Sequence, residues 1–525
     1  QRAAQLTGFA LMMKGREDDR RLFERGVKLN VMAMVNSTSL DVDTLVQGIE
    51  LSQHGLTAED LTALKDLFEH ATTFGSLIQV PKTLAKKLPA LKQLSETNSQ
   101  DMFVKEVLEH LAPLVQQAEI LAAQYDAVVA NPPYMGGKGM NADLKRLAKD
   151  NFPDAKSDLF ACFIERGYTL AKATGHNAMV TMQSWMFLSS YEQMRESILS
   201  QRTIENMVHM ANGVMKIAFG TNATIFRNLS ISGYKSSFSY VGGDDINEDG
   251  VPFEFPVKNE RLKEVAQDEF KKIPGSPVAY WASCKVRDVF MTGTEFENDA
   301  IPRQGLGTTD NNRFVRFWGE ISFNKVGFGN SSADSAKKSG MKWFPYSKGG
   351  GFRKWFGNDR DVINWENDGE SIRLALVGMN PNIPRSEKHY FKEGLTWGLI
   401  TSAEFSARYS VQGGIFDVGG SKAFPKKDIQ MPLLGLLNSK ITKLSLKTLN
   451  PTLNFQVGDL KRIPVLQLDN LKLTNSSIVS SLVEFARADW DAFERSWDFN
   501  SLQLLTVPDE QNKTLASNYA IWITQ

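Results

Sequence analysis

Asn131-Pro132-Pro133-Tyr134 follows the apolar run Asp126-Ala127-Val128-Val129-Ala130, and this stretch decides how the first half of the chain is read. The run is typical of a buried strand, and the two prolines stiffen the turn after it and remove two N–H donors. The Asn131 side-chain oxygen and the Pro132 carbonyl are therefore acceptors held in place. Two such acceptors favour the pyramidal nitrogen with which an exocyclic amine attacks a methyl donor, and the Tyr134 ring offers a face for a base.

A strand followed by an ordinary proline turn is the simpler interpretation of the same residues. The tetrapeptide, however, stands directly after a buried-strand pattern, which is the context that a catalytic turn requires. The active-site interpretation is therefore favoured.

The composition of the whole chain indicates an ordinary globular protein. Its 525 residues suffice for roughly two to four domains, and its formal net charge is zero. No run of eighteen apolar residues and no basic-then-apolar leader is present, so we expect no membrane span and a cytoplasmic, bacterial protein. Cys162, Cys284 and the six histidines lack the spacing of a disulfide or metal site, so we expect no bound metal.

Residue patterns around Asn131 predict alternating helices and strands. We expect a helix from Arg2, a strand over Val31–Val35, and a helical insertion over residues 56–124 that opens with the capping pair Thr57 and Asp60. After the tetrapeptide, a glycine-rich loop covers 135–140, helices open at 157 and 192, and strands are expected over 177–182, 204–208 and 223–226. This order is typical of an α/β unit.

The glycine-rich cofactor motif expected early in such a sheet does not occur in the chain. The first residues already follow a helical pattern, so we expect that motif upstream of Gln1.

Residues 301–465 are basic, with 24 Lys and Arg against 14 Asp and Glu, and they are rich in glycine, tryptophan and phenylalanine. This mixture suits phosphates and flat bases. A solvated basic face is the alternative.

Asn131-Pro132-Pro133-Tyr134, the helix opening at Ser157-Asp158-Leu159-Phe160, the stretch Met182–Leu188 and the basic region together resemble the adenine-specific DNA methyltransferases of BREX phage-exclusion systems, of the PglX type. The resemblance covers nearly all of the chain. It implies an α/β fold: a partial Rossmann-like class I methyltransferase domain, then a mixed α+β target-recognition domain. It also implies S-adenosylmethionine as methyl donor, double-stranded DNA as substrate and other BREX proteins as partners.

Under this resemblance, residues 1–240 are the catalytic domain, 241–300 a linker region, 301–465 the target-recognition domain and 466–525 a C-terminal helical segment. Fused restriction–modification enzymes share the arrangement more loosely. Two departures stand out: the donor motif is missing, and members of the family continue well beyond Gln525.

The resemblance assigns roles to individual positions. Asn131 and Pro132 hold the amine, Pro133 completes the motif, Tyr134 stacks on the flipped base, and Phe219 closes its other side. The residues expected near the methyl donor are Asn131, Asp158, Phe163 and Asn36.

DNA contacts are expected in the basic region. Lys348, Arg353 and Lys354 stand in a glycine-rich loop that suits phosphates, and Arg385 or Arg408 suits guanine edges. Thr308 and Asn311 belong to a polar turn that resembles target-recognition loops. A plain surface role remains the alternative for each of these side chains.

Three functions are compatible with the sequence. The first is an adenine methyltransferase that marks host DNA. The second is a module that recognises DNA sequence with little turnover. The third keeps the chemistry but acts on RNA bases or protein glutamine side chains, and the basic, aromatic-rich region favours duplex DNA over both.

Overall fold

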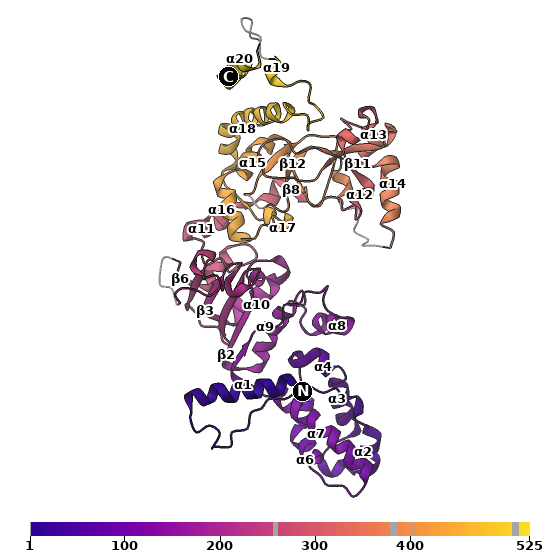
Figure 1. The fold of residues 1–525 in the computed structure, drawn as a ribbon, viewed down its shortest axis with the longest axis vertical. Helices are drawn as coiled ribbons and strands as arrows, with labels where there is room; N and C mark the ends of the chain where they lie inside the picture. Colours follow the sequence, from indigo (N-terminus) through magenta and orange to yellow (C-terminus); the bar gives the residue numbers. More distant parts are fainter. Residues whose placement is uncertain (1, 256–260, 379–385, 402–403, 507–513, 525) are drawn as a thin grey trace. The chain divides into compact units, whose positions relative to one another are not determined.

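The computed structural model describes residues 2–255, 261–378, 386–401, 404–506 and 514–524 (Figure 1). The chain forms two compact units. The first comprises Gln1–Trp185 and Ser190–Gln267, and the second comprises Met186–Ser189 and Asp268–Gln525. Across the described ranges, we find no helix with both the length and the apolar character needed to cross a bilayer.

The N-terminal part of the first unit is helical, as the sequence predicted for residues 56–124. After α1 (Arg2–Asp18), the helices are α2 (Val42–Gly48), α3 (Ala58–Leu67), α4 (Ala71–Phe74), α5 (Lys82–Ala85), α6 (Leu88–Ser95) and α7 (Met102–Ala122). The fully buried core residues of this bundle all lie between Leu40 and Leu121. The predicted capping box is present: Asp60 N–H donates to Thr57 Oγ1, and Thr57 N–H donates to the Asp60 carboxylate.

The strand predicted over Val31–Val35 is wrong, because these residues are irregular. The side chain of Gln117, which is fully buried in α7, accepts from Val35 N–H at 3.1 Å and donates to the Val35 carbonyl at 3.1 Å. A single amide thus satisfies the backbone groups that a neighbouring strand would otherwise pair. The apolar character of the segment reflects packing on the helical bundle, since Met34 contacts its core.

A six-stranded mixed sheet forms the rest of the first unit, in the order β1-β2-β4-β3-β5-β6. Its strands are β1 (Tyr125–Ala130), β2 (Ala171–Met182), β3 (Thr203–Met210), β4 (Thr221–Arg227), β5 (Lys235–Val241) and β6 (Lys263–Ala266). The connecting helices are α8 (Ala142–Asn151), α9 (Leu159–Leu170) and α10 (Glu192–Gln201). β1 and β2 are parallel, and β4 runs antiparallel to both β2 and β3.

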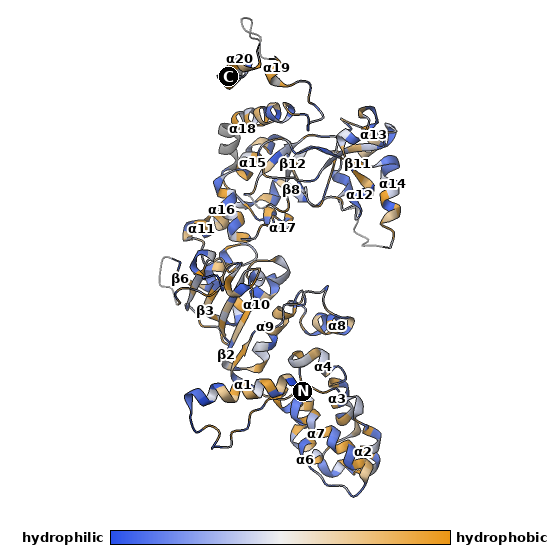
Figure 2. Ribbon diagram, in the orientation of Figure 1, coloured by the Kyte–Doolittle hydropathy of each residue, from blue (hydrophilic) through white to orange (hydrophobic). Residues whose placement is uncertain are grey.

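Side-chain chemistry explains why these segments form the sheet. In Figure 2 the strands around β2 carry mainly hydrophobic residues, whereas α8 is mostly hydrophilic. Along β2, burial alternates over its last eight residues, as expected for a strand with two differently packed faces. The predicted strands over 177–182, 204–208 and 223–226 lie inside β2, β3 and β4.

The second unit contains two four-stranded sheets, ordered β14-β10-β11-β9 and β13-β12-β15-β8, and the short pair β16-β7. Its strands are β7 (Thr294–Glu295), β8 (Ala300–Arg303), β9 (Val315–Phe317), β10 (Trp343–Ser347), β11 (Asp361–Asn364), β12 (Gly394–Trp397), β13 (Ala407–Ser410), β14 (Ile415–Phe416), β15 (Lys422–Pro425) and β16 (Pro464–Val465). Its helices are α11 (Cys284–Thr292), α12 (Asn311–Phe314), α13 (Ala333–Lys338), α14 (Glu366–Ala375), α15 (Gln430–Leu437), α16 (Lys440–Leu449), α17 (Val457–Lys461), α18 (Leu468–Asp491), α19 (Gln503–Thr506) and α20 (Leu515–Thr524).

The units divide the chain differently from the predicted domains. Residues 241–300 are not a linker, because β6 extends the sheet of the first unit and α11 belongs to the second. Nor do residues 466–525 stand apart, because α18 packs on α15 and contributes Val479, Val483 and Trp490 to the core of the second unit. The predicted fold class, an α/β sheet domain followed by a mixed α+β domain, is confirmed.

Candidate active site

Asn131 begins the turn at the end of β1, and the structure ties this turn to the neighbouring strand. The Tyr134 hydroxyl lies 3.2 Å from the Val180 carbonyl of β2 and 3.3 Å from Asn131 Oδ1. Pro132 is buried while Asn131 is exposed, so the side-chain oxygen of Asn131 is accessible at the carboxyl end of the strand. This is the end at which open α/β sheets bind ligands.

The loop after Tyr134 is held by the N-terminus of α9. Asp158 is the N-cap of that helix, and its Oδ1 accepts from Phe160 N–H at 3.3 Å and from Met135 N–H at 2.9 Å. Leu159 N–H donates to the Met135 carbonyl at 3.1 Å, which closes the loop from the other side. Burial raises the pKa of Asp158 above its ordinary value. The carboxylate therefore positions the turn through Oδ1, while a contact of Asp158 with the methyl donor stays a prediction.

Three aromatic rings surround the turn. The Tyr134 centroid lies 5.7 Å from that of Phe219 at an interplanar angle of 65°, and 6.2 Å from that of Phe160 at 89°. The structure thus brings Tyr134 and Phe219 together, as expected for two sides of a base site. A base sandwiched between parallel rings needs roughly 7 Å, twice the ~3.5 Å carbon contact distance. At this separation and tilt the two rings do not form parallel faces that could hold a base between them, and Phe219 is 37% exposed.

Buried His209 and half-buried Gln183 support Phe219 through the residue that follows it. His209 Nε2 lies 2.6 Å from Gln183 Oε1, so the imidazole N–H donates to the amide oxygen. Gln183 N–H in turn donates to the Gly220 carbonyl at 3.1 Å. A Cβ at Gly220 would lie 2.4 Å from Gln183 Cδ and Nε2, so any side chain there would displace the Gln183 amide or the Gly220 backbone. Burial lowers the pKa of His209 to about 4, which keeps the imidazole neutral at pH 7.

Sequence reasoning gave Gln183, His209 and Asn222 no role. Asn222 is fully buried at the start of β4, and its Oδ1 accepts from Thr224 Oγ1 at 2.8 Å and from Trp185 Nε1 at 3.3 Å. These residues lie far from Asn131 in the sequence. Gln183 falls in the stretch Met182–Leu188 that carries the resemblance, whereas His209 and Asn222 belong to no motif singled out there. The one available signal was the pair Phe219-Gly220, since a glycine directly after an exposed aromatic residue often marks a close approach of another group.

The remaining residues expected near the methyl donor have structural contacts. Asn36 Oδ1 accepts from Thr72 N–H at 2.9 Å and from Thr72 Oγ1 at 3.0 Å, which ties the segment before α2 to α4. Phe163 is half-buried on α9, one turn after Asp158. Neither observation tests a contact with the donor.

In the expected phosphate-binding loop, two of the three basic side chains are already engaged in contacts within the second unit. The Arg353 guanidinium pairs with Asp489 at 2.6 Å and lies 5.1 Å from the Trp490 ring. Lys354 Nζ donates to the Asn438 carbonyl at 3.2 Å. Lys348 is half-buried.

Two further DNA-contact candidates are buried. Arg408 is 2% exposed, and its guanidinium donates to the carbonyls of Gly349 and Arg353. Burial lowers the pKa of Arg408 to about 10. Thr308 is likewise 2% exposed and donates to Asn311 Oδ1 at 2.6 Å, whereas Asn311 itself is exposed. Arg408 and Thr308 therefore shape loops and do not present their side chains to a DNA groove. Arg385 lies outside the described residues.

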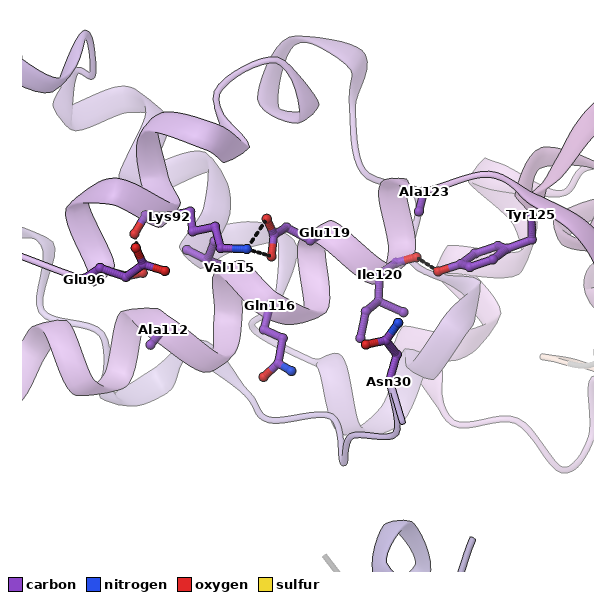
Figure 3. A pocket seen from close by; sticks show the side chains of 11 residues that line it. Asn30, Lys92, Glu96, Ala112, Val115, Gln116, Glu119, Ile120, Ala123 and Tyr125 are labelled. Atoms are coloured by element: carbon purple, nitrogen blue, oxygen red, sulfur yellow. Dashed lines mark hydrogen bonds and ion pairs between the residues drawn. The ribbon is translucent and has the colours of Figure 1, made fainter. Parts of the chain in front are cut away.

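A separate pocket of about 520 Å³ opens between the helical bundle and the start of β1. Figure 3 shows the Lys92 amine facing the Glu119 carboxylate, and Tyr125 donating its hydroxyl proton to the Ile120 carbonyl. Since no member of the Asn131–Tyr134 turn lines this pocket, it is distinct from the aromatic site. Among the described residues, no group of three or more His, Cys, Asp or Glu side chains is arranged to hold a metal ion.

The family model described as Eco57I restriction-modification methylase matches residues 1–215. The adenine-specific methyltransferase BrxX of Escherichia coli O9:H4 (strain HS) is 39% identical over 549 residues, covering 99% of this chain and 44% of that protein. Over 99% of its length the chain is similar to the adenine-specific methyltransferases BrxX and PglX, and it covers 44% of each.

The resemblance drawn from the sequence is thereby confirmed. PglX of Lacticaseibacillus casei (strain Zhang) is 34% identical over 541 residues, again covering 99% of this chain and 44% of the relative. The chain thus spans less than half the length of both relatives. A solved structure of the Type IIL restriction-modification enzyme MmeI in complex with DNA is 12% identical, with a TM-score of 0.45, over 92% of this chain and 71% of that one.

Proposed function

We propose that this chain is part of a site-specific DNA methyltransferase that transfers a methyl group from S-adenosylmethionine to the N6 amine of adenine and marks host DNA in a BREX-type phage defence system. The observation that carries the proposal is the turn at the end of β1. It places the exposed Asn131 oxygen beside Tyr134 and Phe219. The relatives' names supply the base and the type of system.

The residues of the turn suit an adenine amine for a physical reason. The amine lone pair is delocalised into the ring, and acceptors at Asn131 Oδ1 and the Pro132 carbonyl would stabilise the developing positive charge as the nitrogen becomes pyramidal. The Tyr134 hydroxyl contacts Asn131 Oδ1 at 3.3 Å and so orients the amide oxygen. Because the hydroxyl also contacts Val180, the orientation is anchored to the sheet.

S-adenosylmethionine would supply the electrophilic methyl group. The residues present fit the methyl-accepting side of such a site, since Asn131 is exposed at the carboxyl end of β1 with aromatic rings beside it. Asn131 is the residue of this chain that would face the donor. The glycine-rich motif that holds a donor in related sheets does not occur in this sequence.

Aromatic rings at the turn also support base flipping. A base lifted from the duplex needs a flat, apolar surface in place of its stacked neighbours, and Tyr134 with Phe219 provides two such faces once the rings separate. The second unit would supply DNA recognition, with exposed Asn311 as one candidate contact.

The decisive experiment is methylation-sensitive sequencing of a host that carries the full-length gene, compared with the Asn131→Ala variant. We expect N6-methyladenine at one sequence motif in the first host and its loss in the second. Methylation that persists with Asn131→Ala would refute the catalytic assignment. A full-length protein that binds DNA specifically but leaves every adenine unmodified would favour the recognition module instead.

A further inference from the structure

A pocket of about 350 Å³ lies within the second unit, and its wall combines aromatic rings with carboxylates. The rings are Phe323, Phe328 and Trp497, and the carboxylates are Asp359 and Asp498. Neither lysine nor arginine nor histidine is found among the described residues that line it. The motifs singled out in the sequence do not include this group.

The rings form adjoining faces that are tilted relative to one another. The Phe323 and Phe328 centroids are 5.0 Å apart at an interplanar angle of 32°, and those of Phe328 and Trp497 are 5.4 Å apart at 52°. A flat base inserted between two parallel rings requires roughly 7 Å. These rings are too close together for that, whereas tilted adjoining faces suit a compact group that touches several of them at once.

The charge of the pocket wall indicates which kind of ligand the pocket can bind. The negative faces of aromatic rings attract cations, and carboxylates add to that attraction. Ser347 Oγ donates to Asp359 Oδ1 at 2.8 Å and fixes that carboxylate at the pocket wall. A phosphate or another anion would meet two carboxylates with no basic residue of the lining to offset them.

An adjacent pocket of the protein shows the same pairing of a cation with an aromatic ring. A smaller pocket of about 100 Å³ shares Asp359, Trp497 and Asp498 with the first. There the Arg487 guanidinium lies 4.7 Å from the Phe356 ring. An arginine of this chain thus already uses an aromatic face beside the shared carboxylates.

We propose that the aromatic and acidic pocket formed by Phe323, Phe328, Trp497, Asp359 and Asp498 binds a compact organic cation, of the guanidinium or quaternary ammonium class. The cation is either a side chain of a partner polypeptide or a free small molecule, and the chemistry that recognises it is the same. This site does not depend on methyl transfer at Asn131.

The first test is calorimetric titration of the full-length protein with tetramethylammonium, with N-acetyl-arginine methylamide and with neopentyl alcohol, the last being a neutral group of similar size. We expect one or both cations to bind roughly tenfold more tightly than the neutral compound. Equal affinity for all three, or tighter binding of adenosine than of either cation, would overturn the proposal.

The second test uses variants. Asp498→Asn is expected to weaken cation binding about fivefold, because it removes one charge from an exposed side chain without altering its shape. Trp497→Leu is expected to weaken it roughly tenfold. Asp334→Asn, an exposed carboxylate on α13 outside the pocket, is the matched control and should change nothing. Unchanged affinity in Asp498→Asn would refute the site even if Trp497→Leu fails to fold.

The source of the cation is resolved by a third titration. A short peptide with one arginine or trimethyl-lysine between neutral residues should bind at least as tightly as the free cation if a partner polypeptide supplies it. Tighter binding of the free cation would identify a small molecule, and both results support the site. If neither form shows saturable binding, the pocket is not a cation site.

Discussion

Replacing Gly220 with alanine tests whether the Gln183 side chain holds the proposed base site in its working geometry. The new Cβ would lie 2.4 Å from Gln183 Cδ and Nε2, whereas carbon contacts are normally about 3.5–4.0 Å. About 1 Å of displacement must therefore be absorbed. The atoms that the new Cβ would meet lie at the far end of the Gln183 side chain, but His209 Nε2 holds the Gln183 amide oxygen at 2.6 Å.

The size of the effect depends on which neighbour yields. If the Gln183 side chain moves, its hydrogen bond to His209 is lost. That loss costs about 1 kcal/mol, which corresponds to roughly a fivefold change in rate. If the Phe219-Gly220 segment moves, the Phe219 ring shifts by about 1 Å relative to Tyr134, and a misplacement of that size costs up to roughly a hundredfold in rate. We therefore expect a loss between about fivefold and a hundredfold in the single-turnover rate of adenine methylation by the full-length protein.

The test is a double-mutant cycle. In the Gln183→Ala background the clashing atoms are absent, so Gly220→Ala should cost less than about threefold there. Gly243→Ala is the control, because a Cβ at that exposed glycine meets nothing within 4 Å. An equal loss from Gly220→Ala in both backgrounds would refute the contact as the cause.

Four further predictions follow from named contacts. Asn131→Ala should lower the methylation rate of the full-length protein about a hundredfold, with a much smaller change in donor affinity measured by calorimetry. Tyr134→Phe should lower that rate roughly threefold to tenfold, because the hydroxyl that orients Asn131 is lost while the ring remains; full activity would exclude this role. The folded-state pKa of His209, about 4, lies below its ordinary 6.5, so protonation favours unfolding. Stability is retained above pH 6.5 and falls towards pH 4, by about 1 kcal/mol at pH 5.5, and denaturation curves of His209→Gln should not show this loss. Arg408→Gln should lower the melting temperature of the second unit, whereas Lys348→Gln should leave it unchanged and reduce the salt dependence of DNA binding by about one unit.

The sequence predicted the strands of the sheet and the turn after β1 because both depend on local patterns. Apolar runs of strand length and a proline turn after Ala130 are visible within a few residues of one another. Helical periodicity and the Thr57–Asp60 capping box likewise depend on residues three and four apart. Such features needed no knowledge of long-range contacts.

The predictions that were wrong concern residues whose contacts lie far away in the sequence. Val31–Val35 has strand-like composition, but its backbone partner is the side chain of Gln117, 82 residues further along the chain from Val35. From the sequence, Arg408 was expected to be available for DNA. In the structure it lies on β13, is buried and donates to the Gly349 carbonyl. The acceptors and partners that decide both cases come from distant segments, and one sequence does not reveal which segments meet.

The closed contact between Tyr134 and Phe219 has a consequence for the order of events on DNA. Asn131 is exposed, so these rings do not shield it from solvent, but a base that is to lie between them must first part the two rings. Insertion of the base would then lag behind its departure from the duplex. A fluorescent base analogue at the target position should brighten first, when it leaves its stacked neighbours, and dim in a second, slower phase when the rings close on it.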